Sequence, residues 1–211
     1  MFIIPPVAFV LFGVPIRQTV VSTWVMMVIL TVGSHLLLRR YPSTLELLAE
    51  FVDDNVSAMI GRPAAPYIPV LGSLTVFIAA ANTVGVVPVV MSPTRDISTP
   101  AALALVVFFS VHWFGISEKG VKEYLKGLAT PLVTLPLELI GQLSRTLSLT
   151  LRLFGNVLST DLLVAVVFSL LPLIVPIPLM AFSLLTGLLQ AYIFTVLAAV
   201  YIGAAVAASA D

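Results

Sequence analysis

The sequence predicts an all-α, polytopic membrane protein with about five membrane helices, formed as a single membrane domain over residues 1–211. Three observations predict this fold. Hydrophobic residues make up 60% of the chain and charged residues only 9%, whereas about a quarter of the residues in a soluble domain are charged. Apolar segments of about 20 residues recur, which is the length that crosses a bilayer as a helix. Most charged residues lie in the connections between these segments.

The composition also excludes several classes of function. A formal net charge of zero, with no basic cluster interleaved with aromatic residues, argues against nucleic-acid binding. The chain has no cysteine, and its two histidines, His35 and His112, fall in different predicted spans, so we expect no metal site and no cofactor. There is no glycine-rich phosphate loop, so any nucleotide chemistry would belong to partner proteins.

The first half of the chain contains three ordinary spans, at residues 18–38, 67–90 and 97–117. The apolar residues before them lack a basic leading region and are broken by Pro5 and Pro6, which indicates a short interfacial lead-in and not a cleaved signal peptide.

Lysine and arginine predict the orientation, because cytoplasmic loops carry an excess of both. Two connections are basic, through Arg39, Arg40, Arg62, Lys119, Lys122 and Lys126. We therefore expect the N-terminus outside and the C-terminus in the cytoplasm.

Residues 43–60 predict an amphipathic cytoplasmic helix. Ser43 and Glu46 have capping-box spacing, apolar residues recur at helical spacing, and Gly61 is a natural stop. The opposite side is acidic, through Glu46, Glu50, Asp53 and Asp54. A solvated connecting helix and a specific partner contact both remain open.

Two further segments are too long for upright spans. Residues 130–171 would form a helix of about 60 Å, whereas a hydrocarbon core is about 30 Å thick. Residues 177–208 have the same excess, so the two segments are expected to form a long, strongly tilted hairpin.

One arginine, Arg152, lies well inside the first of these segments. A fixed charge at membrane depth indicates a functional site, and its distance from the helix end disfavours snorkelling to the headgroups. At about 100° per residue, a polar stripe follows one side of the helix. It contains Glu138, Gln142, Arg145, Ser148, Arg152, Asn156, Ser159 and Thr160.

Two acids flank that arginine on the same helix. Glu138 lies about 21 Å to one side, and Asp161 lies about 13 Å to the other at a different azimuth. This arrangement indicates two separate ion paths. The alternative for the first acid is an intramembrane salt bridge between Glu138 and Arg145.

Polar residues elsewhere offer partners for this helix. In residues 177–208, Ser183, Gly187, Ala191 and Thr195 repeat every four residues, and Gln190 lies close to this small-residue ladder as either interhelical glue or an ion ligand. Asn82 and Asp96 could hydrate an outer vestibule, with Ser183 beside them. Alternatively, Arg95 and Asp96 neutralise one another.

The stretch LSLTLRLFGN, residues 147–156, resembles the signature of subunit a of the F-type ATP synthase. The resemblance is close from Pro131 to the C-terminus. Arg152 takes the place of the family's essential arginine, Glu138, Asn156 and Gln190 match family positions, and Asp161 replaces a frequent glutamate. The chain departs from some members at Gly85, where they have an aspartate, and at Ser183, where they have a histidine.

The resemblance implies a non-catalytic stator subunit with two half-channels to the carboxylates of the c-subunit ring. Arg152 would couple ion flow to ring rotation and prevent leak. Asp161, Asn156 and Gln190 would line the outer path, and Glu138, Ser148 and Gln142 the cytoplasmic one. Expected partners are the c ring, the peripheral-stalk b subunits, the rest of the ATP synthase and membrane lipid.

The expected ion is H+, with Na+ as an alternative within the family. The compactness of the chain and the lack of a targeting segment favour a bacterial plasma membrane as the location. A stand-alone secondary transporter is disfavoured because no internal repeat is visible. A purely structural membrane subunit would not need Arg152.

Overall fold

The chain folds into long helices. The computed structural model describes residues 7–11, 14–85, 92–129, 135–170 and 176–207. Within those ranges, five helices are long and apolar enough to cross a membrane, so the predicted all-α, polytopic fold is confirmed. These helices are α1 (Gln18–Arg40), α3 (Ile68–Gly85), α4 (Ser98–Lys119), α6 (Leu135–Leu170) and α7 (Pro176–Ala207).

The helix bounds lie close to those expected from the apolar runs. Helices α1, α4 and α7 begin within one residue of the predicted positions. Parts of three predicted ranges lie outside the described residues, namely 86–90 after α3, 130–134 and 171 around α6, and 208 after α7.

The first residues contain a feature that the sequence analysis does not predict. Strands β1 (Val7–Leu11) and β2 (Val14–Arg17) form an antiparallel hairpin, in which Val10 is opposite Pro15. Proline is tolerated in such an edge strand because its missing N–H need not pair within a larger sheet. The prolines favour an irregular lead-in, but they are compatible with a two-stranded ribbon.

Two shorter helices complete the fold. Helix α2 (Pro42–Ile60) begins after Tyr41 with proline in its first turn and ends at Gly61, whose φ of 72° is the left-handed value that glycine favours. The capping box predicted at Ser43 is therefore wrong, because Ser43 lies inside the helix. Helix α5 (Val121–Ala129) is absent from the sequence-based prediction.

Helix α7 is the centre of the packing. It contacts α2, α3, α4 and α6. Half of the residues in its most hydrophobic stretch are buried, compared with 6% of those in the corresponding stretch of α6. Phe194 and Ile202 of α7 and Leu71 and Ile78 of α3 are completely buried in the same core. Helix α6 packs against α4 and α7 along one side and leaves the other side open.

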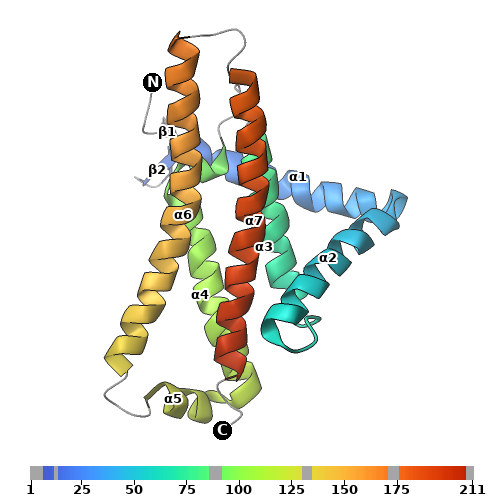
Figure 1. Ribbon diagram of the computed structural model, residues 1–211, viewed down its shortest axis with the longest axis vertical. Helices are drawn as coiled ribbons and strands as arrows, with labels where there is room; N and C mark the ends of the chain where they lie inside the picture. Colours follow the sequence, from blue (N-terminus) through green and yellow to red (C-terminus); the bar gives the residue numbers. More distant parts are fainter. Residues whose placement is uncertain (1–6, 12–13, 86–91, 130–134, 171–175, 208–211) are drawn as a thin grey trace.

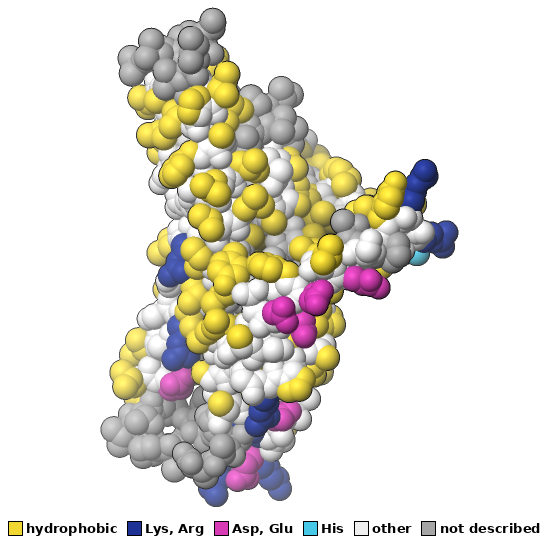
Figure 2. All heavy atoms as spheres, turned by 45° about the vertical axis from the view of Figure 1, so that its right-hand side comes forward, with side chains coloured by type: hydrophobic (Ala, Val, Ile, Leu, Met, Phe, Trp, Pro, Cys, Tyr) yellow, Lys and Arg dark blue, Asp and Glu magenta, His cyan; other side chains and the backbone are white. Residues whose placement is uncertain are grey.

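The long hairpin of α6 and α7 runs along the whole molecule, and α1 crosses its direction (Figure 1). At 1.5 Å per residue, the 36 residues of α6 and the 32 of α7 are about 54 and 48 Å long. Figure 2 shows hydrophobic side chains spread in many patches over the visible face, and large exposed residues include Trp113 and Phe109. Such a surface suits contact with lipid over much of the molecule.

The contact between α3 and α7 depends on small residues, as the ladder predicted. Gly187 lies against Asn82, whose Nδ2 donates a hydrogen bond of 2.9 Å to the Gly187 carbonyl. Farther along the same pair, the hydroxyls of Thr75 and Thr195 lie 2.6 Å apart. The absent side chain at Gly187 lets the two backbones approach.

This packing makes a prediction for Gly187→Ala. A Cβ there would lie 2.8 Å from Asn82 Cβ, so α3 and α7 must separate, and we expect a loss of about 1–3 kcal/mol in the free energy of unfolding. The measurement is thermal unfolding of the purified protein in detergent. Gly33→Ala is the control, because a methyl group at that position would meet nothing within 4 Å and the helix there gains propensity. Equal unfolding temperatures for the two variants would contradict this account.

Candidate functional site

Arg152 lies on the open side of α6. Its side chain is exposed, and it makes no hydrogen bond or ion pair with any residue that the structure describes. Small polar residues share this side, and Leu147 and Leu151 beside them are more than half exposed. We call this side the open face of α6, formed by Ser144, Ser148, Arg152 and Ser159.

The polar stripe predicted on α6 divides between two environments. Ser148, Arg152 and Ser159 stay on the open face, whereas Gln142 is 8% exposed and turns into the bundle. Asn156 and Thr160 are half-buried and line a pocket. The helix therefore presents polar groups both to the bundle and to whatever covers the open face.

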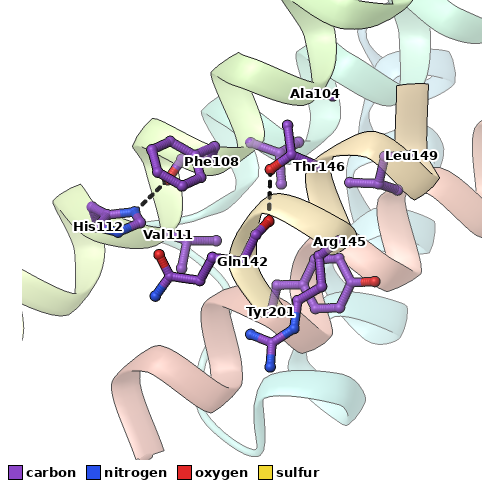
Figure 3. A pocket seen from close by; sticks show the side chains of 10 residues that line it. Ala104, Phe108, Val111, His112, Gln142, Arg145, Thr146, Leu149 and Tyr201 are labelled. Atoms are coloured by element: carbon purple, nitrogen blue, oxygen red, sulfur yellow. Dashed lines mark hydrogen bonds between the residues drawn. The ribbon is translucent and has the colours of Figure 1, made fainter. Parts of the chain in front are cut away.

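One pocket lies among α4, α6 and α7, on the N-terminal side of Arg152 (Figure 3). It is partly open to the surface and leaves about 30 Å³ that a water molecule can reach, which is room for about one water. We call it the His112 pocket. Its polar lining consists of His112 from α4, Gln142, Arg145 and Thr146 from α6, and Tyr201 from α7.

The charged groups beside this pocket are linked. Arg145 Nη1 lies 3.7 Å from Glu138 Oε1, so the predicted salt bridge between the two is present. Gln142 Nε2 donates to the same carboxylate oxygen at 3.4 Å, and the Arg145 guanidinium lies 5.6 Å from the centre of the Tyr201 ring. Glu138 is thus tied to two residues that line the pocket.

A second pocket lies among α3, α6 and α7, on the C-terminal side of Arg152. We call it the Asp161 pocket. Its polar lining consists of Asn82, Ser92, Asn156, Thr160, Asp161 and Ser183. The structure therefore brings together Asn82, Asn156, Asp161 and Ser183, which the sequence analysis assigned to the outer path and its vestibule. Asp161 lines this pocket although a helical wheel places it outside the polar stripe.

Asp161 has an ion-pair partner that the sequence analysis does not assign. Arg95 Nε lies 3.1 Å from Asp161 Oδ2, and each side chain is about a quarter exposed. Arg95 belongs to the short 3-10 helix η1 (Pro93–Arg95), which packs against α6. The Arg95 guanidinium therefore gives this carboxylate a counter-charge from another element of the fold.

Asp96 has a different role from the vestibule predicted for it. It is 3% exposed and is not among the residues that line the Asp161 pocket. Its carboxylate accepts hydrogen bonds from Arg17 at 2.6 Å and from the Ser98 backbone N–H at 3.1 Å. The pairing of Arg95 with Asp96 that the sequence allowed is wrong, because each residue has another partner.

The surroundings of Asp96 also affect its titration. Burial on its own would raise the pKa of the Asp96 carboxyl, but the hydrogen bonds from Arg17 and Ser98 outweigh it and lower the pKa below its ordinary value. Asp96 therefore fastens β2 to the start of α4 as an ionised group.

Two amides have unpaired atoms inside the protein. Gln142 Oε1 and Gln190 Nε2 are buried and have no hydrogen-bond partner among the described residues. Gln142 Oε1 is a hydrogen-bond acceptor, whereas Gln190 Nε2 is a donor, so the two unpaired atoms need partners of opposite kinds. Neither Gln190 nor Ser148 lines the two pockets. No group of three metal-ligating side chains comes together in the described part of the chain.

Sequence reasoning missed three residues that the fold brings to these sites, Arg95, His112 and Tyr201. Each belongs to an element far in sequence from α6, and only packing reveals the contact. A signal was available for Arg95, because an arginine in a short loop between two spans needs a counter-charge, and Asp96 was not the only acid that could supply it.

Comparisons with known proteins agree over nearly the whole chain. A model of the family described as ATP synthase A chain matches residues 16–203. A relative from Bradyrhizobium sp. (strain BTAi1), named ATP synthase subunit a 2, is 47% identical, covering 92% of this chain and 90% of the relative. Relatives from Acaryochloris marina, named ATP synthase subunit a 2, and Albidiferax ferrireducens, named ATP synthase subunit a, are each 40% identical over 90% of this chain, covering 86% and 87% of those proteins.

The lowered pKa of Asp96 makes a prediction for acid stability. A lowered folded-state pKa gives stability that is present above the unfolded-state value of about 4 and lost as the pH falls through the folded-state value. We expect the unfolding temperature in detergent to decrease when the pH is lowered beneath about 4. Asp96→Asn should lose part of this acid dependence and be about 1–3 kcal/mol less stable at pH 7.

The control for that measurement is Asp54→Asn, which changes an exposed carboxylate on α2. It should leave both the stability at pH 7 and the acid dependence nearly unchanged. The assignment of Asp96 as a structural ion pair fails if the two variants behave alike.

Proposed function

Because the chain belongs to the ATP synthase A chain family, we propose that it is the ion-translocating stator subunit of a rotary ATP synthase. In this proposal the chain is not catalytic itself. It provides two offset half-channels to the carboxylates of a c-subunit ring, and Arg152 couples ion flow to rotation. The peripheral-stalk b subunits and the rest of the synthase are its further partners.

The observation that carries the proposal is the position of Arg152. It is exposed on the open face of α6, has no counter-charge among the described residues, and lies between the His112 pocket and the Asp161 pocket. A permanent cation in a membrane needs protein or water in front of it. A ring carboxylate that passes along the open face would supply the missing anion.

The two pockets support two separate paths. On α6, Gln142 lies about 15 Å before Arg152 and Asp161 about 13 Å after it, so the paths do not meet except at the arginine. Asp161, Asn156 and Gln190 serve the outer path in this proposal, with Asn82 and Ser183 beside them. Glu138, Gln142 and Ser148 serve the cytoplasmic path.

Arginine suits the position between the paths because it does not lose its proton in proteins. A histidine or lysine there could be discharged by the ion that it separates. Arg152 holds the ring carboxylate ionised until the ring moves it toward the next ion, and its charge repels a cation that would pass directly from one pocket to the other.

The small side chains of the open face support contact with a rotating partner. Ser144, Ser148 and Ser159 leave room around the arginine, so another helix can pass closely. The exposed leucines between them offer an apolar surface that lipid or a ring helix can cover.

The remaining parts of the proposal are the ion, the orientation and the membrane. The transported ion is H+, and Na+ is the alternative within the same family. The basic connections at Arg39, Arg40 and Lys119–Lys126 lie in the cytoplasm of a bacterial plasma membrane, which leaves the N-terminus outside and the C-terminus inside.

The proposal predicts that Arg152→Ala abolishes ATP-driven ion pumping by the assembled complex in sealed vesicles while the complex still assembles. The expected loss is at least about 100-fold, because the ring carboxylate loses its counter-charge and the paths are no longer separated. The assay follows acidification of the vesicles, with and without sodium, and a sodium requirement in the wild type would replace H+ by Na+.

Arg62→Ala is the matched control, since Arg62 is an arginine whose ion pair with Glu118 lies at the surface. It should pump at the wild-type rate. Normal pumping by Arg152→Ala would make this chain a structural subunit and would refute the proposed coupling.

A further inference from the structure

We propose that His112 is a proton-transfer residue at the cytoplasmic end of the path, acting together with the buried amide of Gln142. This inference rests on the function proposed above and deepens it, because it names a titrating group for one half-channel. It is carried by the geometry of the His112 pocket, which α4, α6 and α7 line, while Tyr124 of α5 contacts the histidine ring.

The hydrogen bond of the histidine fixes which ring nitrogen is free. His112 Nδ1 lies 2.8 Å from the Phe108 carbonyl oxygen (Figure 3). A carbonyl oxygen only accepts, so Nδ1 carries the proton and Nε2 of the neutral ring has a lone pair. The ring is held in place by Phe108, whose centroid is 4.4 Å away, and by Tyr124 of α5 at 6.0 Å.

The buried side-chain amide of Gln142 is the second group in this proposed proton transfer. Gln142 extends from α6 toward the side of the pocket that carries His112 (Figure 3). Its Nε2 donates to Glu138, but its Oε1 is buried without a donor among the described residues. An acceptor of this kind can hold a water or hydronium in the pocket, next to the histidine.

The proton balance is simple. Nε2 takes a proton from a hydronium ion at the mouth of the pocket, which leaves a water molecule there, and the ring becomes a cation. The same proton then passes to the water held by Gln142 Oε1, and the ring returns to its neutral form. No other bond changes, and the proton continues toward the open face of α6.

The charged and titratable groups around the ring come from every packed element. Tyr124 of α5 contacts the His112 ring. The amino group of Lys119 in α4 lies 5.8 Å from the centre of the Tyr124 ring. Arg145 of α6 lines the pocket with its charge balanced by Glu138, and α7 contributes Tyr201. Of the polar side chains that line the pocket, the imidazole is the one whose ring nitrogen has a lone pair that can take up a proton and release it again.

The test measures ATP-driven proton pumping by the assembled complex in vesicles as a function of the pH on the cytoplasmic side. We expect His112→Gln to slow pumping at least about threefold above pH 7, and less at pH 5.5, where hydronium is plentiful. His112→Asn is the second variant, because its shorter amide can still donate a hydrogen bond to the Phe108 carbonyl oxygen but has no group that takes up a proton.

The chain provides its own control, because it has only two histidines. His35 is exposed on α1, far from the pocket in the fold, and His35→Gln should keep the wild-type pH profile. Profiles of both His112 variants that overlay the wild type, or that are lowered equally at every pH, would overturn the proposal. Arg152→Ala in the same vesicles reports on the proposed function separately, because that variant fails at every pH if the function is right.

Discussion

A permanent charge cannot be left in hydrocarbon, and the rest of the structure can be understood from this constraint on Arg152. Helix α6 is packed on one side only, and the arginine lies on the side that is not packed. The other arginines that reach the described core region have acids beside them, as Arg95 has Asp161 and Arg145 has Glu138. In the function proposed above, a carboxylate of another chain supplies the anion for Arg152, and the open face is the interface with that chain.

The scaffold behind this face is rigid because α7 is buried among its neighbours. Gly187 and Thr195 bring α3 close to α7, and the completely buried Phe194 and Leu153 fill the space toward α6. Asp96 joins the N-terminal hairpin to α4 through Arg17. Polar groups in the two pockets are thus held on packed helices, while the open face of α6 has no partner among the described residues.

The sequence predicted the long helices well, because charge-free runs of that length have few other solutions in a membrane. It also predicted that acids would flank Arg152. Contacts between distant elements were beyond it: the wheel separated Asp161 from Asn156, yet the packing of α3 and α7 around α6 encloses both in one pocket. The capping box at Ser43 failed because Pro42 starts the helix one residue earlier. The sequence considers His112 only as a metal ligand, and its pocket appears only when α4, α6 and α7 meet.

The central claim is that the two pockets open to opposite sides of the membrane, and cysteine labelling tests it most directly. The chain has no cysteine, so Thr146→Cys in the His112 pocket and Thr160→Cys in the Asp161 pocket each introduce a single thiol into it. In vesicles of known orientation, a small membrane-impermeant thiol reagent should label the first variant from the cytoplasmic side only and the second from the opposite side only. Labelling of both variants from the same side would contradict the account.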